Sequence, residues 1–292
     1  IYSDEDKLDE QGEHVEAFFK PDWSPEFLLS TMYTCHLGVY RKSLVDEVGG
    51  FRRGFEGAQD FDLVLRLTER TQRIHHIPQI LYHWRRTSGS TAVAYDSASG
   101  GKSAVEASMK ALGLALSRRK IEGHVENGTY HGSYRIRPEL PPKISVSVII
   151  PTRDKVDHLR RCVDSIIRLT QRAQYELIIA DNGSREPSTK EYLNSFVKGG
   201  YGRVISCPGE FNFSAINNAA AVHAQGDALL FLNNDTEVLE GGWLAAMLEP
   251  LQLPEVGAVG AKLLYPDNTI QHAGIVLWHS GTAAHVLSRL PR

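Results

Sequence analysis

ISVSVIIPTRDK, residues Ile144–Lys155, and YELIIADNGS, residues Tyr175–Ser184, are the stretches that decide how this chain folds. Each begins with apolar, largely β-branched residues and ends in polar residues that suit a loop. Such runs are typical of buried strands in a parallel sheet. The residues between them predict a helix over about 156–170, because apolar side chains recur there at helical spacing. These side chains are Val156, Leu159, Val163, Ile166 and Ile167.

The alternation of strand and helix continues toward the carboxyl end. Strand-like runs at 204–206 and 228–232 are separated by helical patterns near Lys190, from Ser214 and around 243–251. This order predicts an α/β fold, a doubly wound and mostly parallel sheet with helices on both faces. In open sheets of this kind, ligands bind at the carboxyl ends of the strands. The loops that would meet there are 151–155, 181–184 and 233–236.

The first part of the chain follows another pattern. Residues 1–92 include a long polar stretch and a strand-like run at 37–40, and end near an apolar run at 80–84. Helices are predicted near 25–30, 43–48 and 60–68.

A segment of different composition separates the two parts. Residues 88–102 are rich in Ser, Gly and Ala, 103–120 have the residues of a good helix, and prolines follow at 138, 141 and 142. We therefore expect a linker or bridging element over 93–143, between a first unit at 1–92 and a second unit at 144–292.

Length and composition restrict the classes of protein. The 292 residues allow two domains, and a formal net charge of −3 gives no field that would attract nucleic acid or anionic lipid. The three cysteines fit neither a disulfide framework nor a zinc site, which favours a reducing cytoplasm. No apolar run reaches the length of a membrane span, so no transmembrane segment is expected. An initial Ile in place of Met is typical of a processed or excised piece.

Several motifs together resemble the family 2 glycosyltransferases, inverting sugar-nucleotide enzymes of GT-A fold. In the first unit these are Asp4-Glu5-Asp6, Phe19–Pro25, Gly49–Phe51, Glu56–Leu63 and Tyr82–Arg85. The resemblance implies that residues 1–92 are the acceptor-side part of one such domain and residues 144–292 the nucleotide-sugar-binding part of the next. The chain would then start midway through one domain and stop midway through a second.

The resemblance assigns roles in the first unit. Asp4 and Asp6 would bind Mn²⁺ or Mg²⁺ as an Asp-x-Asp motif, with His83 completing the metal shell, and Asp60 would be the catalytic base. Acidic triplets are also common on solvated loops, and acids near Asp60 also suit a helix N-terminus without any function. His83, beside Trp84, is equally compatible with a packed, hydrogen-bonded residue.

In the second unit the resemblance implies a nucleotide-sugar site. Its residues would be Pro151, Thr152, Arg153, Asp154, Asp181, Asn217, Asn218, Asn233, Asn234 and Asp235. Asp235 would also be a metal ligand. The pattern departs from Asp-x-Asp at Asn233, and no counterpart of the Asp60 region follows, so this unit would lack its own base. Asp181-Asn182-Gly183 also suits a plain tight turn.

Similar sequences occur in long bacterial proteins with tandem glycosyltransferase domains that build surface polysaccharide, often described as rhamnosyltransferase-like. The implied reaction is metal-assisted transfer of a sugar, with inversion, from a nucleoside-diphosphate sugar to a saccharide or lipid-linked saccharide acceptor. The implied location is the cytoplasm or the inner face of the membrane.

Two alternatives stay open, a non-catalytic sugar-nucleotide-binding or scaffolding module, and a homo-oligomer or domain swap in which the halves complement each other. A dinucleotide oxidoreductase is excluded, because residues 151–155 contain no glycine fingerprint.

Overall fold

The computed structural model describes residues 1–86, 101–171, 175–277 and 281–292, and the side chains of residues 101 and 102 are not among those described. The chain divides into two compact units, Ile1–Glu139 and Leu140–Arg292. Part of the expected linker, residues 93–100, lies outside the described residues.

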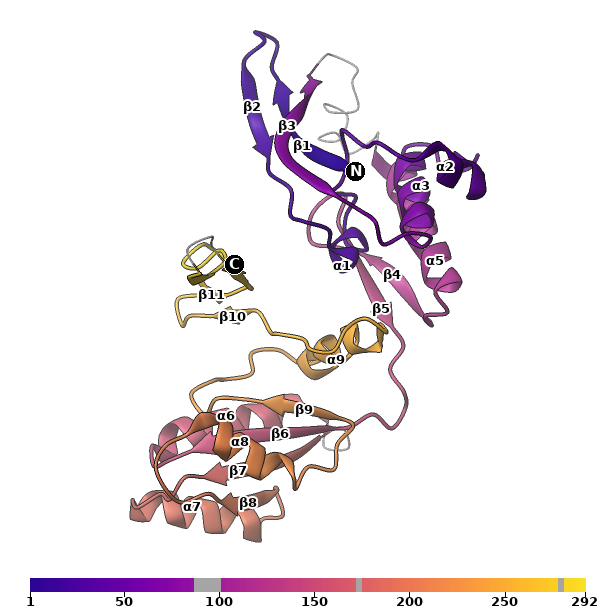
Figure 1. The fold of residues 1–292 in the computed structure, drawn as a ribbon. Coiled ribbons are helices and arrows are strands. Elements are labelled where there is room, and N and C mark those ends of the chain that lie inside the picture. Colours follow the sequence, from indigo (N-terminus) through magenta and orange to yellow (C-terminus); the bar gives the residue numbers. More distant parts are fainter. Residues whose placement is uncertain (87–100, 172–174, 278–280) are drawn as a thin grey trace. The chain divides into compact units, whose positions relative to one another are not determined.

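The first unit is built on a three-stranded sheet of order β2-β1-β3 (Figure 1). Its strands are β1 (Tyr2–Leu8), β2 (His14–Phe18) and β3 (His76–Arg85). β1 pairs antiparallel with β2 and parallel with β3. The helices are α1 (Pro25–Leu28), α2 (Lys42–Glu47), α3 (Gln59–Thr68) and α5 (Gly101–Arg118). The strand-like run at 37–40 forms only an isolated bridge between Gly38 and Tyr2.

The segment expected as a linker contributes to the core of the first unit. Helix α5 buries Ala107, Ala111, Leu112 and Ala115 in the cluster that holds the apolar face of α3. The hairpin of β4 (Gly123–Asn127) and β5 (Tyr134–Pro138) adds to the same cluster through Tyr134. Apolar residues at helical spacing need a surface to cover them, and α3 supplies it.

The second unit contains a parallel four-stranded sheet of order β8-β7-β6-β9, which confirms the α/β fold class. Its strands are β6 (Val146–Thr152), β7 (Tyr175–Asp181), β8 (Arg203–Ser206) and β9 (Ala228–Phe231). The helices are α6 (Val156–Leu169), α7 (Pro187–Lys198), α8 (Phe213–Ala221) and α9 (Trp243–Leu248), followed by the short 3₁₀ helix η2 (Pro250–Gln252). Two small hairpins follow, β10 (Leu263–Leu264) with β11 (Ile270–His272) and β12 (Ile275–Leu277) with β13 (Ala283–His285).

Both faces of this sheet are covered. Successive side chains of a strand point to opposite faces, so the consecutive buried residues of β6 and β7 need a helix on each side. Val148 and Ile150 belong to the core beneath α6, whereas Ile149 belongs to the core beneath α8. Figure 1 draws α6 and α8 on opposite sides of the sheet. The carboxyl ends of β6 and β7 therefore lie at one edge of a buried sheet.

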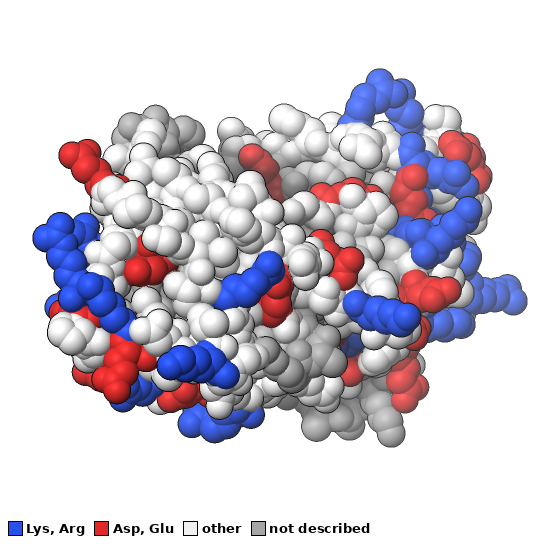
Figure 2. Space-filling view, turned by 90° about the horizontal axis from the view of Figure 1, so that it is seen from below, with Lys and Arg blue, Asp and Glu red and all other residues white. Residues whose placement is uncertain are grey.

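No helix among the described residues is long and apolar enough to cross a membrane. On the face that Figure 2 draws, basic and acidic side chains are interspersed among uncharged residues.

A glycine before β9 lets two backbone segments approach closely. A Cβ on Gly226 would lie 2.5 Å from the backbone nitrogen of Ser147, a distance that side chains do not tolerate. We expect Gly226→Ala to lower the free energy of unfolding by about 1–3 kcal/mol, measured by urea denaturation, because the buried backbone must shift. Gly257→Ala, where a Cβ meets nothing within 4 Å, is the control. Equal stability of the two variants would contradict the expectation.

Candidate functional site

The acidic triplet of the first unit lies inside strand β1 and is buried, which contradicts the alternative of a solvated loop. Asp4, Glu5 and Asp6 are 3%, 7% and 5% exposed. Buried carboxylates need partners. Asp4 Oδ1 accepts the backbone N–H of Lys20 at 2.9 Å and lies 2.8 Å from His76 Nε2. Through these contacts Asp4 joins β1 to β3 and to the segment before α1.

Glu5 is paired with a buried cation. Its Oε2 lies 3.1 Å from Lys20 Nζ and accepts the backbone N–H of His36 at 2.8 Å. Burial by itself raises the pKa of Glu5, but the hydrogen bonds from His36 and the charge of Lys20 outweigh it and lower the pKa. Glu5 is therefore a structural carboxylate that holds the chain around Lys20.

Asp6 faces two histidines from the neighbouring strands. Its Oδ1 lies 2.5 Å from His83 Nδ1 on β3, and its Oδ2 lies 2.8 Å from His14 Nδ1 on β2. Burial alone raises the pKa of Asp6, but the hydrogen bonds from His83 and His14 outweigh it and lower the pKa. Within the described part of the chain, these three residues form the group whose ligand atoms lie close enough to hold a metal ion. Asp4 does not join this group.

His14 was missed by the sequence reasoning. It is one of 12 histidines in the chain, and it lies in a polar stretch without a motif. The only sequence signal available was the turn-rich Asp9–Glu13 segment, which would bring two flanking strands together as a hairpin. The predicted pair of Asp6 and His83 is brought together by the structure, since these residues are partners in the register of β1 and β3.

The predicted base, Asp60, lies in the first turn of α3 and is half-buried. Its Oδ1 accepts the backbone N–H of Phe61 at 2.8 Å. Burial, and after it the charge of Asp60, raise the pKa of Tyr40 to about 12. Asp60 thus keeps a carboxylate oxygen available for proton transfer.

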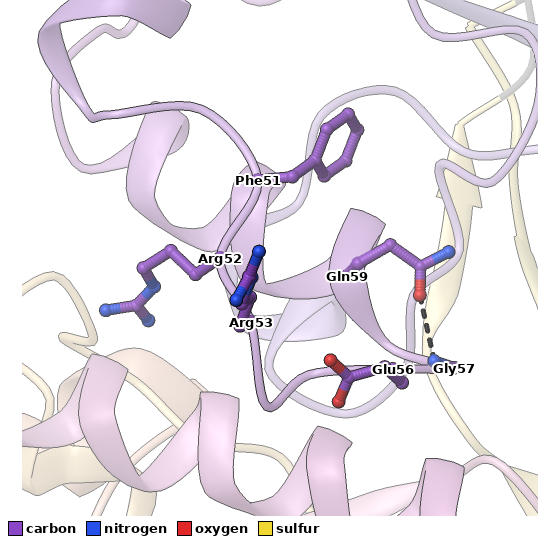
Figure 3. A pocket seen from close by; sticks show the side chains of 6 residues that line it. All are labelled: Phe51, Arg52, Arg53, Glu56, Gly57 and Gln59. Atoms are coloured by element: carbon purple, nitrogen blue, oxygen red, sulfur yellow. Dashed lines mark hydrogen bonds between the residues drawn. The ribbon is translucent and has the colours of Figure 1, made fainter.

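An open pocket of about 430 Å³ lies at the loop before α3, and Gln59, which precedes Asp60 in the sequence, is one of its lining residues (Figure 3). Its lining residues are Phe51, Arg52, Arg53, Glu56, Gly57 and Gln59. The ring of Phe51 is 65% exposed and stands at one end of the cavity. Gln59 Oε1 accepts the backbone N–H of Gly57 at 2.9 Å, which fixes the opposite wall. An exposed aromatic ring among polar groups suits the mixed surface of a sugar ring.

In the second unit, Asp154 ties together the loops that follow β6 and β7. Its Oδ1 accepts the backbone N–H groups of Arg185 and Glu186 at 2.7 and 2.8 Å. These bonds, that of Glu186 first, lower the pKa of Asp154 despite some desolvation. Asp181 Oδ1 accepts the backbone N–H of Ser184 at 2.9 Å, which closes the turn after β7. Asp154 and Asp181 thus have structural partners as well as positions at the predicted crevice.

The loop after β9 joins the same edge. Asn234 Nδ2 donates to Thr152 Oγ1 at 3.0 Å, which links the carboxyl ends of β6 and β9. Asn233 and Asp235 are exposed, and within the described residues Asp235 is not part of a group of three possible metal ligands.

The remaining predicted residues differ in exposure. Pro151 is half-buried, and Arg153 and Asn218 are exposed. Asn217 is 4% exposed, and its Nδ2 donates to the backbone oxygen of Phe213 at 2.8 Å. The Oδ1 atoms of Asn182 and Asn217 are buried and accept no hydrogen bond from the described residues. A buried acceptor without a donor is costly, so both atoms suit a group that brings donors.

The second unit is similar to a known protein family. Residues 147–276 match the family model described as Glycosyl transferase family 2. The chain is 44% identical over 290 residues to the uncharacterized protein y4gI of Sinorhizobium fredii, covering 98% of this chain and 32% of that protein. It is 42% identical over 293 residues to the O-antigen biosynthesis protein RfbC of Myxococcus xanthus, covering 100% of this chain and 22% of that protein. The chain therefore spans a third or less of these relatives.

Among solved structures, the chain is similar to a mannosyltransferase, PcManGT of Pyrobaculum calidifontis, in complex with GDP-Man and Mn²⁺. The identity is 17% and the TM-score 0.36, with 53% of this chain and 44% of that chain covered.

Proposed function

We propose that the protein transfers a sugar from a nucleoside-diphosphate sugar to a saccharide acceptor, with inversion, since residues 147–276 match the model of glycosyltransferase family 2. The observation that carries the proposal is the joined loop edge of the second unit. Three loops meet there at the carboxyl ends of parallel strands, which is where open α/β sheets bind nucleotides.

The donor would bind along this edge. Thr152 and Asn234 hold each other in place, and Asp181 ends β7 where it can accept a hydrogen bond from a nucleotide base. The buried acceptors of Asn182 and Asn217 support a ligand with donor groups. Asp235, exposed next to Asn234, would face the diphosphate through a divalent cation.

The first unit would carry the acceptor chemistry of its own domain, as a reaction site separate from the donor site of the second unit. A divalent cation such as Mn²⁺ or Mg²⁺, held by Asp6 and His83, would supply positive charge for a leaving diphosphate. Asp60 would take the proton from the acceptor hydroxyl as that oxygen attacks the anomeric carbon. The pocket at the loop before α3 would hold the acceptor sugar, with Phe51 stacking on the apolar face of its ring.

We further propose that the two units are parts of successive glycosyltransferase domains. Residues 1–92 would be the acceptor-side part of one and residues 144–292 the nucleotide-sugar-binding part of the next. Residues 101–139 would belong to the first, because α5 and the β4–β5 hairpin pack into its core. The similarity to an O-antigen biosynthesis protein supports bacterial surface polysaccharide as the product and a cytoplasmic place of work, where nucleotide sugars are made.

A thermal-shift titration with UDP, dTDP and GDP, each with and without Mn²⁺, tests the donor site. A ligand that binds only the folded state at 100 times its Kd stabilises by about 2.7 kcal/mol, a rise in Tm of about 5–10 °C for a unit of this size. We expect one nucleotide to give such a rise, and Asp235→Ala to remove its dependence on Mn²⁺.

The matched control is Asp164→Ala, an exposed carboxylate on α6 away from the loop edge. This variant should keep the full, metal-dependent shift. No shift with any nucleotide would contradict a donor site in this chain and would leave the non-catalytic scaffolding module as the better account.

A further inference from the structure

Three adjacent strands of the first unit each present one potential metal ligand at the same place. β1 lies between β2 and β3, and the central strand carries Asp6. His83 is the register partner of Asp6 on β3. His14 is the partner of Leu8 on β2, and therefore lies diagonally across from Asp6. The sheet thus gathers one carboxylate and two imidazoles from residues far apart in the sequence.

The geometry of the three groups is compact and open to solvent. All three ligand atoms lie within 4.8 Å of one another, and the rings of His14 and His83 meet edge to face with centroids 4.6 Å apart. The Asp6 side chain is 6% exposed, whereas those of His14 and His83 are 60% and 43% exposed. A buried anion beneath two accessible imidazoles lets an ion enter from solvent and leaves positions for further ligands.

We propose that Asp6, His14 and His83 together bind a divalent transition-metal ion, with His14 as a ligand, and that the site prefers Mn²⁺ and Zn²⁺ to Mg²⁺. The proposal deepens the metal part of the proposed function, but binding of the ion does not depend on sugar transfer.

The chemistry of the donors sets the preference. Imidazole suits Zn²⁺ and other transition metals, whereas Mg²⁺ demands oxygen ligands in a near-ideal octahedron and gives up its waters reluctantly. Ligands about 2.1 Å from one ion lie at most about 4.2 Å apart, so only small side-chain movements are needed to accommodate it. The ion would replace the hydrogen bonds that Asp6 now makes with both rings.

Neighbouring acids do not compete for the same role. Asp4 is held by His76 and by the backbone of Lys20, and Glu5 by Lys20 and His36. Glu16, the acid nearest to His14 along β2, is paired with Lys7 and Arg86. Asp4 and Glu5 therefore have structural roles, whereas Asp6 is the carboxylate of the triplet that can bind the ion.

The test measures metal binding directly, without nucleotide, on the whole chain carrying Asp235→Ala so that the second unit contributes no carboxylate at that position. After EDTA treatment and dialysis, Zn²⁺ and Mg²⁺ are titrated by calorimetry, and Mn²⁺ by the loss of the free-ion EPR signal. We expect His14→Ala and His83→Ala each to weaken Mn²⁺ and Zn²⁺ binding by about 10–100-fold or more and to leave weak Mg²⁺ binding unchanged.

His124→Ala is the matched control, because His124 is an exposed histidine on β4 of the same unit, near a carboxylate of Glu126. Both tested histidines are largely exposed, so their variants should fold, which circular dichroism checks. Pulsed EPR of bound Mn²⁺ adds a second readout, since coordinated imidazole gives ¹⁴N couplings that should decrease in His14→Ala. Mn²⁺ and Zn²⁺ affinities of His14→Ala equal to those of His124→Ala, with unchanged ¹⁴N couplings, would overturn the proposal.

These results are independent of the donor site. Metal binding that depends on His14 stands even if no nucleotide stabilises the second unit. Conversely, a nucleotide shift that depends on Asp235 stands even if His14 binds no ion. The two experiments therefore separate failure of this inference from failure of the proposed function.

Discussion

Replacement of Asp62 by Ala is expected to lower the free energy of unfolding of the first unit by about 3–5 kcal/mol, because it leaves a buried guanidinium without its counter-ion. The Asp62 side chain is 1% exposed, and Oδ2 accepts from Arg66 Nη2 at 2.7 Å and from Arg52 Nε at 3.0 Å. Arg66 in turn donates to the backbone oxygens of Val48 and Gly50, so the carboxylate orients a cation that joins α3 to the segment after α2. Urea denaturation followed by circular dichroism measures the loss.

Asp46→Ala is the control for this prediction. Asp46 pairs with Lys42 at 2.6 Å, but its side chain is 58% exposed, and solvent-exposed pairs contribute about 0–1 kcal/mol. A similar loss of stability in both variants would contradict the assignment of Asp62 as a buried anchor.

The stability difference between the wild type and Asp62→Ala should also depend on pH. Burial raises the pKa of Asp62, but Arg52 and Arg66 outweigh it and hold the pKa below its ordinary value of 3.8. A carboxyl whose pKa is lowered in the folded state stabilises fully above its unfolded pKa, and this stability is lost as the pH falls through the folded pKa. The difference should therefore persist at neutral pH and shrink only below about pH 4.

Asp60→Asn is expected to lower the rate of sugar transfer by about 10²–10⁴-fold while leaving stability nearly unchanged, because it removes a general base. The amide oxygen can still accept the hydrogen bond that Asp60 Oδ1 takes from the backbone of Phe61, and Asp60 is only half-buried. The measurement is the initial rate of nucleoside diphosphate release in the presence of a saccharide acceptor. We expect the loss to appear in kcat, with KM for the donor little changed.

Asp46→Asn makes the same change from acid to amide on the exposed face of α2 and should leave the rate at the wild-type level. A rate for Asp60→Asn within a factor of about two of this control would place the base elsewhere. Asp60 and Asp62 thus form a test within one motif, since removing one carboxylate should slow the reaction and removing the other should destabilise the first unit.

Much of the second unit could be predicted from its sequence. The apolar starts of the stretches 144–155 and 175–184, and the helix predicted over about 156–170, coincide closely with β6, β7 and α6. Long apolar runs and a regular helical stripe determine burial locally, so the parallel α/β sheet followed from them. The sequence did not show which polar loop residues hold the structure and which are open to a ligand, because an Asp can do either. Asp154 and Asp181 both make contacts within turns.

The first unit was less predictable. The sequence left open whether the acidic triplet binds a metal or lies on a solvated loop. The structure buries it in β1, where His76, Lys20 and His83 from distant parts of the chain are its partners. The segment 101–139 was expected to bridge the units, yet its helix packs on α3. Neither the pairing of buried carboxylates with distant residues nor the packing of distant segments can be recognised from a local sequence pattern.

The sequence by itself determined the strands and helices of the parallel α/β sheet, their order and the likeness to a sugar-nucleotide enzyme, because periodicity and loop composition are local properties. The tertiary structure alone decided which acids are free to act. Asp62 is neutralised by Arg52 and Arg66, whereas Asp60, two residues earlier, keeps a carboxylate oxygen available. The tertiary structure also placed His14 beside Asp6. Their diagonal position across β1 and β2 depends on the strand register, which includes an irregularity between Glu5 and Lys7. Side-chain pairing across the whole sheet determines this register.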